Sequence, residues 1–247
     1  RQRSGGRPSG VTVSEIALVH DADELAEVDD VLRRVWGTDR PLLPLEMLVA
    51  VSHSGGYVAV ARRNGTPVGA SVGLLAVHDG RPALHSHVTG LLAPARAGGL
   101  GRAMKLHQRE WALARRIETI VWTFDPLVRR NAWFNIAVLG ADIADYLPSF
   151  YGRMTDAINA GDESDRLLAS WDLRRTVPDT PRDGSDADDA HILVPTPADV
   201  VELRRSAPDE VAAWRSRTRA ALTDAFAAGR SIVGFTRTGD YVIGSTP

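Results

Sequence analysis

Two histidines stand two residues apart in an apolar stretch of the chain, at His85 and His87, and Thr89 continues the alternation. Alternate residues of a β-strand point to one face, so a strand over 83–92 would place these three side chains together. Imidazole titrates near neutrality, which suits a general base. The alternative is that each histidine is a packed, hydrogen-bonded residue of an ordinary strand.

Asp125 follows a second apolar stretch, residues 118–124. A carboxylate at a strand end could act as a base or hold a substrate amine. It could equally cap a following helix, because Pro126 comes next and suits the first helical position. His85, His87 and Asp125 could also bind a metal ion, but that needs a well-placed third ligand, and we expect no metal site. No Gly-x-Ser-x-Gly turn suggests a hydrolase.

A glycine-rich loop lies between the two stretches, in "ARAGGLGRAMK" at 95–105. A helix start offers unpaired N–H groups and partial positive charge, and glycines let a phosphate approach them closely. No Gly-Lys-Ser/Thr follows, so the loop is not a P-loop, and the glycine spacing differs from the dinucleotide-binding fingerprint. The alternative is a tight turn that binds nothing.

The elements around these residues alternate in type. We expect a strand over 11–19, a helix over 21–36, a three-stranded meander, a helix over 99–116, a strand over 118–124, a helix over 127–139 and two further strands. Asn64-Gly65 is a strong hairpin signal inside the meander. This order predicts an α+β fold with a mixed sheet, and it puts the glycine loop where such folds commonly bind ligands.

The segment 96–101 resembles the Arg/Gln-x-x-Gly-x-Gly/Ala signature of the GNAT N-acetyltransferase superfamily, and "NAWFNIAVLGA" at 131–141 resembles its second motif. With the order of elements, the resemblance covers about 11–174 and looks like a bacterial subgroup with a C-terminal extension. It implies a GNAT-like mixed, mostly antiparallel sheet flanked by helices, and acetyl-CoA or another acyl-CoA as co-substrate. Two strands of that sheet would splay apart around the pantetheine arm, near 85–91 and 120–125.

The resemblance also implies which residues contact the co-substrate. Backbone amides of the glycine loop would hold the pyrophosphate, a basic side chain would add charge, and two asparagines would lie near the cofactor. The implied set is Leu91, Arg96, Ala97, Gly98, Gly99, Leu100, Gly101, Arg102, Asn131 and Asn135. His87, His85 and Asp125 remain the candidate catalytic groups.

The sequence departs from the family pattern at the acid that protonates the leaving thiolate. GNAT enzymes often carry a tyrosine four residues before the glycine that ends the second motif, and here that position is Ile136. Tyr146 or Tyr151 could substitute from the next strand. The missing tyrosine leaves open a non-catalytic CoA-binding or regulatory module as an alternative to an N-acetyltransferase.

The chain divides into a loose tail over 1–10, a GNAT-like domain over 11–174, a polar, proline-bearing linker over 175–190 and a strand–helix–hairpin extension over 191–247. The extension could cap the acceptor site or form a homodimer interface. The 247 residues carry a net charge of −2, no cysteine and no long apolar run. We therefore expect a cytoplasmic protein that binds neither nucleic acid nor membrane. The resemblance implies that it acetylates a small amine or amino-acid-like molecule.

Overall fold

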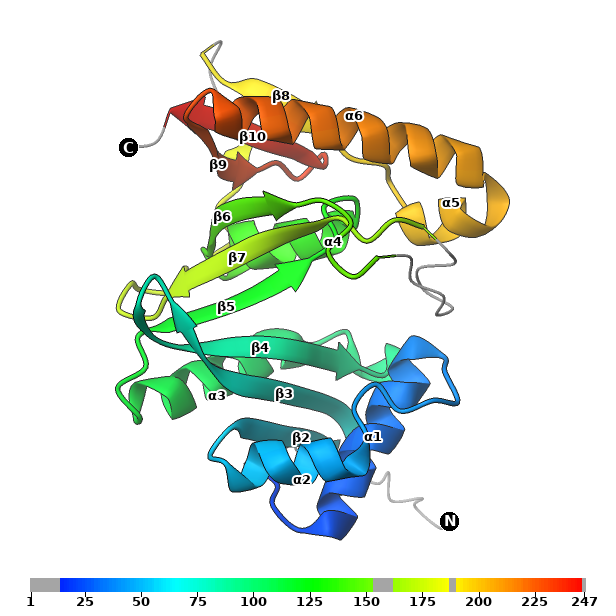
Figure 1. The fold of residues 1–247 in the computed structure, drawn as a ribbon, viewed down its shortest axis with the longest axis vertical. Coiled ribbons are helices and arrows are strands. Elements are labelled where there is room, and N and C mark those ends of the chain that lie inside the picture. Colours follow the sequence, from blue (N-terminus) through cyan, green and yellow to red (C-terminus); the bar gives the residue numbers. More distant parts are fainter. Residues whose placement is uncertain (1–13, 153–161, 187–189, 246–247) are drawn as a thin grey trace, which may run out of the picture.

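A computed structural model describes residues 14–152, 162–186 and 190–245 (Figure 1). The predicted tail over 1–10 lies outside the described residues. Among the described residues, every helix is too short or too polar to traverse a lipid bilayer.

The main sheet has seven strands in the order β1-β2-β3-β4-β5-β7-β6. Every neighbouring pair is antiparallel except β4 and β5, which are parallel. The α+β prediction with a mixed, mostly antiparallel sheet is therefore confirmed. The strands are β1 Ser14–Leu18, β2 Tyr57–Arg63, β3 Thr66–His78, β4 Arg81–Leu91, β5 Thr119–Phe124, β6 Asp142–Leu147 and β7 Arg166–Asp172.

Helices α1 (Ala22–Trp36) and α2 (Leu45–His53) pack on one face of this sheet, which we call the α1/α2 face. The helix α1 begins where Asp21 accepts a hydrogen bond from the Glu24 amide, 2.9 Å away, and it ends at Gly37 in the left-handed region. Its buried residues recur with helical spacing, as an amphipathic helix requires, and are Leu25, Val28, Val31 and Leu32.

Helix α3 (Leu100–Leu113) covers the opposite face, which we call the α3 face. The helix expected over 127–139 is different in kind: α4 (Arg129–Ala132) runs directly into a π-helix over Trp133–Val138. The Leu139 amide accordingly bonds to the Phe134 carbonyl, five residues back, at 3.0 Å. Such π-helical turns are rare and occur frequently at functional sites.

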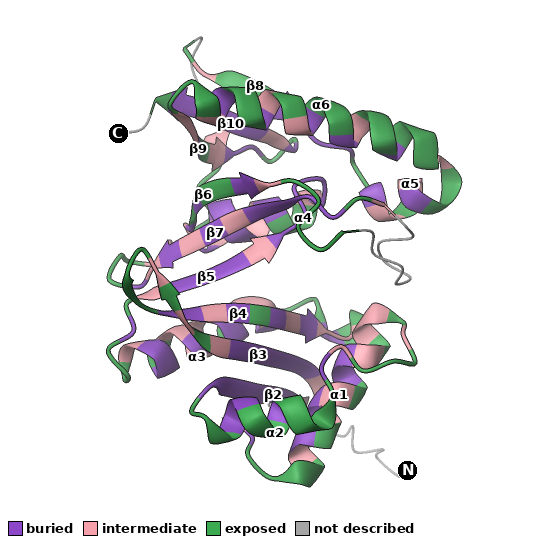
Figure 2. Ribbon diagram, in the orientation of Figure 1, coloured by how far each residue is buried: buried purple, intermediate pink, exposed green. Residues whose placement is uncertain are grey.

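The C-terminal extension has the predicted element order and forms a second sheet of order β8-β10-β9 (Figure 1). It shares a core with the main sheet, because Val194, Leu222 and Phe235 pack in the same buried cluster as Tyr57 and Trp171. Figure 2 shows buried residues along both sheets. The extension is therefore packed onto the core rather than tethered to it. Its elements are β8 Ile192–Pro195, α5 Val200–Ser206, α6 Pro208–Ala227, β9 Arg230–Phe235 and β10 Asp240–Ser245.

Candidate active site

The two central strands of the main sheet separate, as the resemblance implied. β4 and β5 pair only at Leu84–Ile120 and His85–Val121, and beyond these pairs the strands diverge (Figure 1). The split opens toward the carboxyl ends of both strands, where the glycine loop begins.

A β-bulge lies in β4 beside the start of this split. Val72 of β3 pairs with Val88, but the next residue, Gly73, pairs with Ser86, so His87 is an extra residue in β4. The bulge corrects the expectation that His85, His87 and Thr89 share a face, because an inserted residue shifts the alternation by one. Thr89 bonds to Ser71 Oγ at 2.8 Å and faces α3.

The two histidines do come together, on the α1/α2 face. Their ring centroids are 6.0 Å apart, His87 is exposed, and His85 is partly buried. Desolvation lowers the pKa of both imidazoles below the usual 6.5, and for His85 the charges of His87 and Lys105 add to the effect. Both rings are therefore mostly neutral at pH 7 and can accept a proton.

Thr123 of β5 lies on the same face as the histidines, on the other side of the split, because it alternates with Val121, the partner of His85. The Tyr151 hydroxyl reaches Thr123 Oγ1 at 3.3 Å. Tyr146, the other candidate acid, is buried and donates its proton to Asp165. Burial and that carboxylate raise the pKa of Tyr146 well above its usual value. Because Asp165 also bonds to Arg219 of α6, this tyrosine belongs to the contact between the main sheet and α6.

The prediction that Asp125 acts as a base is wrong. Its carboxylate is buried and bonds to Arg215 at 2.7 and 3.0 Å, to Arg204 and to the Leu127 amide. Burial alone would raise the pKa of Asp125, but the charges of Arg215, Arg204 and Arg166 hold it at about 2. The same contacts exclude Asp125 as the third ligand of a metal site, and no group of three possible ligands occurs within the described parts of the chain.

The glycine loop is bare. Gly98 and Gly99 have φ of 87° and 79°, in the left-handed region, and a Cβ built on either would meet no atom within 4 Å. Gly99 is the N-cap of α3 and no side chain caps this helix. The first N–H groups of α3, at Leu100, Gly101 and Arg102, therefore have no side-chain cap, and the open space at Gly98 and Gly99 can accommodate an anion beside them.

The other predicted cofactor residues lie either at the glycine loop or in the helices next to it. Leu91 packs under the loop with Leu100, Ala95 and Met104, and Ala97 is an exposed loop residue. Arg102 instead donates a hydrogen bond to the Pro178 carbonyl at 3.1 Å, which ties α3 to the segment after β7. Asn131 is exposed in α4, whereas Asn135 is buried in the π-helix.

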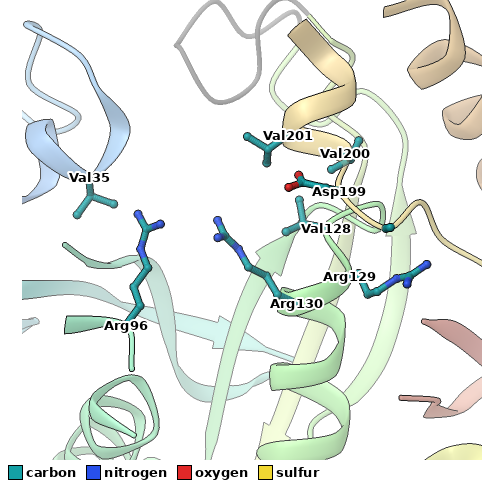
Figure 3. A pocket seen from close by; sticks show the side chains of 9 residues that line it. Val35, Arg96, Val128, Arg129, Arg130, Asp199, Val200 and Val201 are labelled. Carbon is teal, nitrogen blue, oxygen red and sulfur yellow. The ribbon is translucent and has the colours of Figure 1, made fainter. Parts of the chain in front are cut away.

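A cavity of about 280 Å³ opens at the carboxyl ends of β4 and β5. Figure 3 shows the Arg96 and Arg130 side chains pointing into it, while Arg129 turns away to bond Thr196. Its lining comes from the end of α1, the glycine loop, the start of α4 and the start of α5. These residues are Val35, Arg96, Val128, Arg129, Arg130, Ala198, Asp199, Val200 and Val201.

Lys105 is the residue that the sequence reasoning missed. In the helix predicted over 99–116, the apolar residues Ala103 and Ala114 are exposed, whereas Lys105 and Gln108 are buried. A signal was present, since Lys105 is the single lysine beside 28 arginines and lies three and seven residues before Gln108 and Ala112, on one helical face.

No family model and no curated protein matches the sequence, but solved structures match the fold. The Salmonella typhimurium protein yncA, assigned as an acetyltransferase and solved with its cofactor acetyl-CoA, has a TM-score of 0.53 at 18% identity over 68% of this chain and 98% of its own. The ribosomal-protein-S18-alanine N-acetyltransferase of Escherichia coli gives 0.52 at 13% identity, over 68% and 98% of the two chains.

The ribosomal-protein-alanine N-acetyltransferase of Brucella melitensis gives 0.50 at 21% identity, over 64% of this chain and 99% of its own. These structures are covered almost completely, whereas about a third of this chain has no counterpart in them. The strand order, the separation of β4 and β5 and the matching solved structures all agree. This chain has the fold of the GNAT acetyltransferases, with an additional three-stranded sheet at its C-terminus.

Proposed function

We propose that the protein is an acetyl-CoA-dependent N-acetyltransferase. The observation that carries the proposal is the split between β4 and β5, which leads from the bare glycine loop to the histidine pair. Acetyl-CoA would supply a thioester whose carbonyl carbon accepts an amine. The loop fits its pyrophosphate, because α3 begins there without a side-chain cap and because two left-handed glycines leave the space open.

His87 is the proposed base. It stands at the bulge where the split begins, it is exposed to an incoming acceptor, and its lowered pKa keeps it neutral at pH 7. An amine is mostly protonated at neutral pH and attacks only after losing that proton, so direct attack on the thioester needs such a group. His85 would take the proton less readily, since its ring is more buried.

The proposed acceptor is a small amine or amino-acid-like molecule bound on the α1/α2 face. The hydrogen-bonding groups offered there are the two histidines, Thr123 and Tyr151, and the Arg166 guanidinium lies 5.3 Å from the centre of the Tyr151 ring. The cationic residues Arg96 and Arg130 lie instead at the cavity by the strand ends, where they suit the phosphates of the co-substrate (Figure 3).

A homodimer is also proposed, through the edge strand β8, where Ile192 and Leu193 are half exposed.

A non-catalytic CoA-binding module is the second candidate, and one observation favours it. Ile136 occupies the position of the tyrosine acid, and it is buried in the main hydrophobic cluster. A protein of this kind would bind acetyl-CoA and release no CoA from it with any amine.

Acetyl-CoA binding by calorimetry tests the shared part of both candidates. Gly99→Asp places a negative charge beside the proposed pyrophosphate, and we expect it to weaken binding by about 100-fold or more, which corresponds to roughly 3 kcal/mol. Gly99→Asn is the matched control, because asparagine has the same shape, tolerates positive φ and is neutral. Its binding is expected to stay close to that of the wild type.

Absence of acetyl-CoA binding by the folded wild type would contradict the proposed function. Equal loss in both Gly99 variants, with unchanged thermal stability, would place the effect in the backbone conformation rather than in the charge.

A further inference from the structure

The buried amine of Lys105 lies at the floor of the split between β4 and β5. Its Nζ atom donates hydrogen bonds to Ser86 Oγ at 3.0 Å and to Gln108 Oε1 at 3.1 Å, and it stands 3.9 Å from the centre of the Trp122 ring. Lys105 is 5% exposed. Ser86 and Trp122 are the residues directly after the last β4–β5 pair, His85–Val121. The amine therefore contacts both strands where they part.

This position is where a linear co-substrate entering the split must end. With the pyrophosphate at the glycine loop, the arm would run inward along β4 from Leu91 toward Ser86, five residues or about 17 Å. Its reacting end would then come between the two faces of the sheet, with the histidines on the α1/α2 face and Lys105 on the α3 face. The acceptor would approach from the first face and the leaving sulfur would face the second.

Nothing near Lys105 holds it permanently charged. Within the described ranges it forms no ion pair with a carboxylate, and its contacts are a hydroxyl, an amide oxygen and an aromatic ring. Burial lowers the pKa of Lys105 to about 7. The titratable group that senses its charge is His85, on the opposite face of β4, whose pKa the Lys105 charge lowers. A lysine in this state is partly protonated and partly neutral at pH 7, whereas an ordinary surface lysine is almost entirely protonated.

We propose that the Lys105 ammonium is the proton donor to the departing thiolate, in place of the tyrosine that is absent at Ile136. As the carbon–sulfur bond breaks, its electron pair goes to the sulfur, and the sulfur takes a proton from Nζ to give the free thiol. Lys105 is left as a neutral amine and regains its proton from solvent after the products leave. The proton lost by the attacking amine goes separately to His87.

The other candidate acids are placed less well. Tyr146 donates to Asp165 in the contact with α6, away from the split. Tyr151 reaches Thr123 on the α1/α2 face, where the acceptor would lie. Lys105 is the described side chain that contacts both strands from the α3 face and carries a transferable proton at neutral pH.

This inference rests on the proposed function, and its test separates the two. Thiol release from acetyl-CoA, with water and with a library of primary amines, can be followed with Ellman's reagent, because the chain has no cysteine of its own. Lys105→Met keeps the length and the apolar stem of the side chain. We expect its kcat to fall about 100-fold and its affinity for acetyl-CoA to stay unchanged. This loss lies at the low end of the range for general acid catalysis, because a thiolate is already a good leaving group.

Three further variants make the result specific. Lys105→Arg keeps the charge but cannot give up its proton, so it should be as slow as Lys105→Met. Lys105→Cys, alkylated in denaturant with 2-bromoethylamine and refolded, restores an amine at that position alone and should regain activity. Glu110→Gln, on the exposed side of the same helix, should match the wild type.

The pH profile gives the last readout. An acid must be protonated to act, so wild-type kcat should fall as pH rises through the pKa of Lys105, and this alkaline limb should disappear in Lys105→Met. Full activity of Lys105→Met or of Lys105→Arg would overturn the proposal and leave the transferase intact. Acetyl-CoA binding by the wild type without thiol release would overturn both and favour the non-catalytic module.

Discussion

Asp125→Asn is expected to lower the free energy of unfolding by about 3–5 kcal/mol, the usual cost of removing one partner from a buried ion pair. The carboxylate of Asp125 bonds to Arg215 and Arg204, which belong to α6 and α5 of the extension. Asparagine keeps the shape and the bond to the Leu127 amide but removes one of the two carboxylates, Asp125 and Asp162, that these guanidinium groups share. Urea unfolding at pH 7 measures the difference.

The pH dependence of that difference has a definite sign. The folded-state pKa of Asp125, about 2, lies below the ordinary value of 3.8, so its contribution to stability is fully present above the ordinary value and is lost as pH falls through the folded one. The gap between wild type and Asp125→Asn should therefore stay constant from about pH 7 to about pH 5 and narrow below about pH 4.

Asp30→Asn is the matched control, because it makes the same chemical change in an exposed pair with Arg34 on α1. Exposed pairs contribute little, and we expect less than about 0.5 kcal/mol there. Equal effects of the two substitutions would mean that the Asp125 cluster does not hold the extension to the core.

His87→Ala is expected to lower kcat/KM for acetyl transfer by about 100- to 10,000-fold, the range for loss of a general base. The exposed imidazole lies at the β4 bulge, so its removal leaves the core packing unchanged. Steady-state kinetics with an amine found by the thiol-release screen measures the loss, and thermal unfolding checks that the variant is folded.

The sign of the pH effect follows from the role of a base, which must be neutral. Since the pKa of His87 is lowered from 6.5, wild-type kcat/KM should rise with pH and reach half of its maximum below about pH 6.5. This acidic limb should vanish in His87→Ala. His85→Ala is the matched comparison: if it alone removes the limb and the activity, the base is His85.

The sequence was most informative where local rules decide the structure. Alternation and turn residues predicted the meander, the helix expected over 21–36 matches α1, and three glycines marked the start of α3. These features depend on residues close in the chain, so the order of elements and the fold class were accessible without coordinates.

The site was less accessible because it depends on contacts between distant residues. The inserted residue at His87 is defined only by pairing with β3, and it moved Thr89 to the other face. Asp125 is adjacent to Pro126, which suggested a cap or a base, while its partners Arg204 and Arg215 lie 79 and 90 residues later. From the sequence alone Lys105 would be a solvated helix residue, because its burial comes from contacts with β4 and β5.

The burial of the single lysine has a consequence for side reactions. Thioesters acylate free amines without a catalyst, and exposed lysines close to a bound acyl donor are the side chains most readily acylated. This chain presents its positive charge as guanidinium groups, which stay protonated and do not attack, and its one lysine side chain is 5% exposed. The surface therefore offers no exposed lysine amine that an acyl thioester could acylate, and its positive charge is carried by groups that do not react in this way.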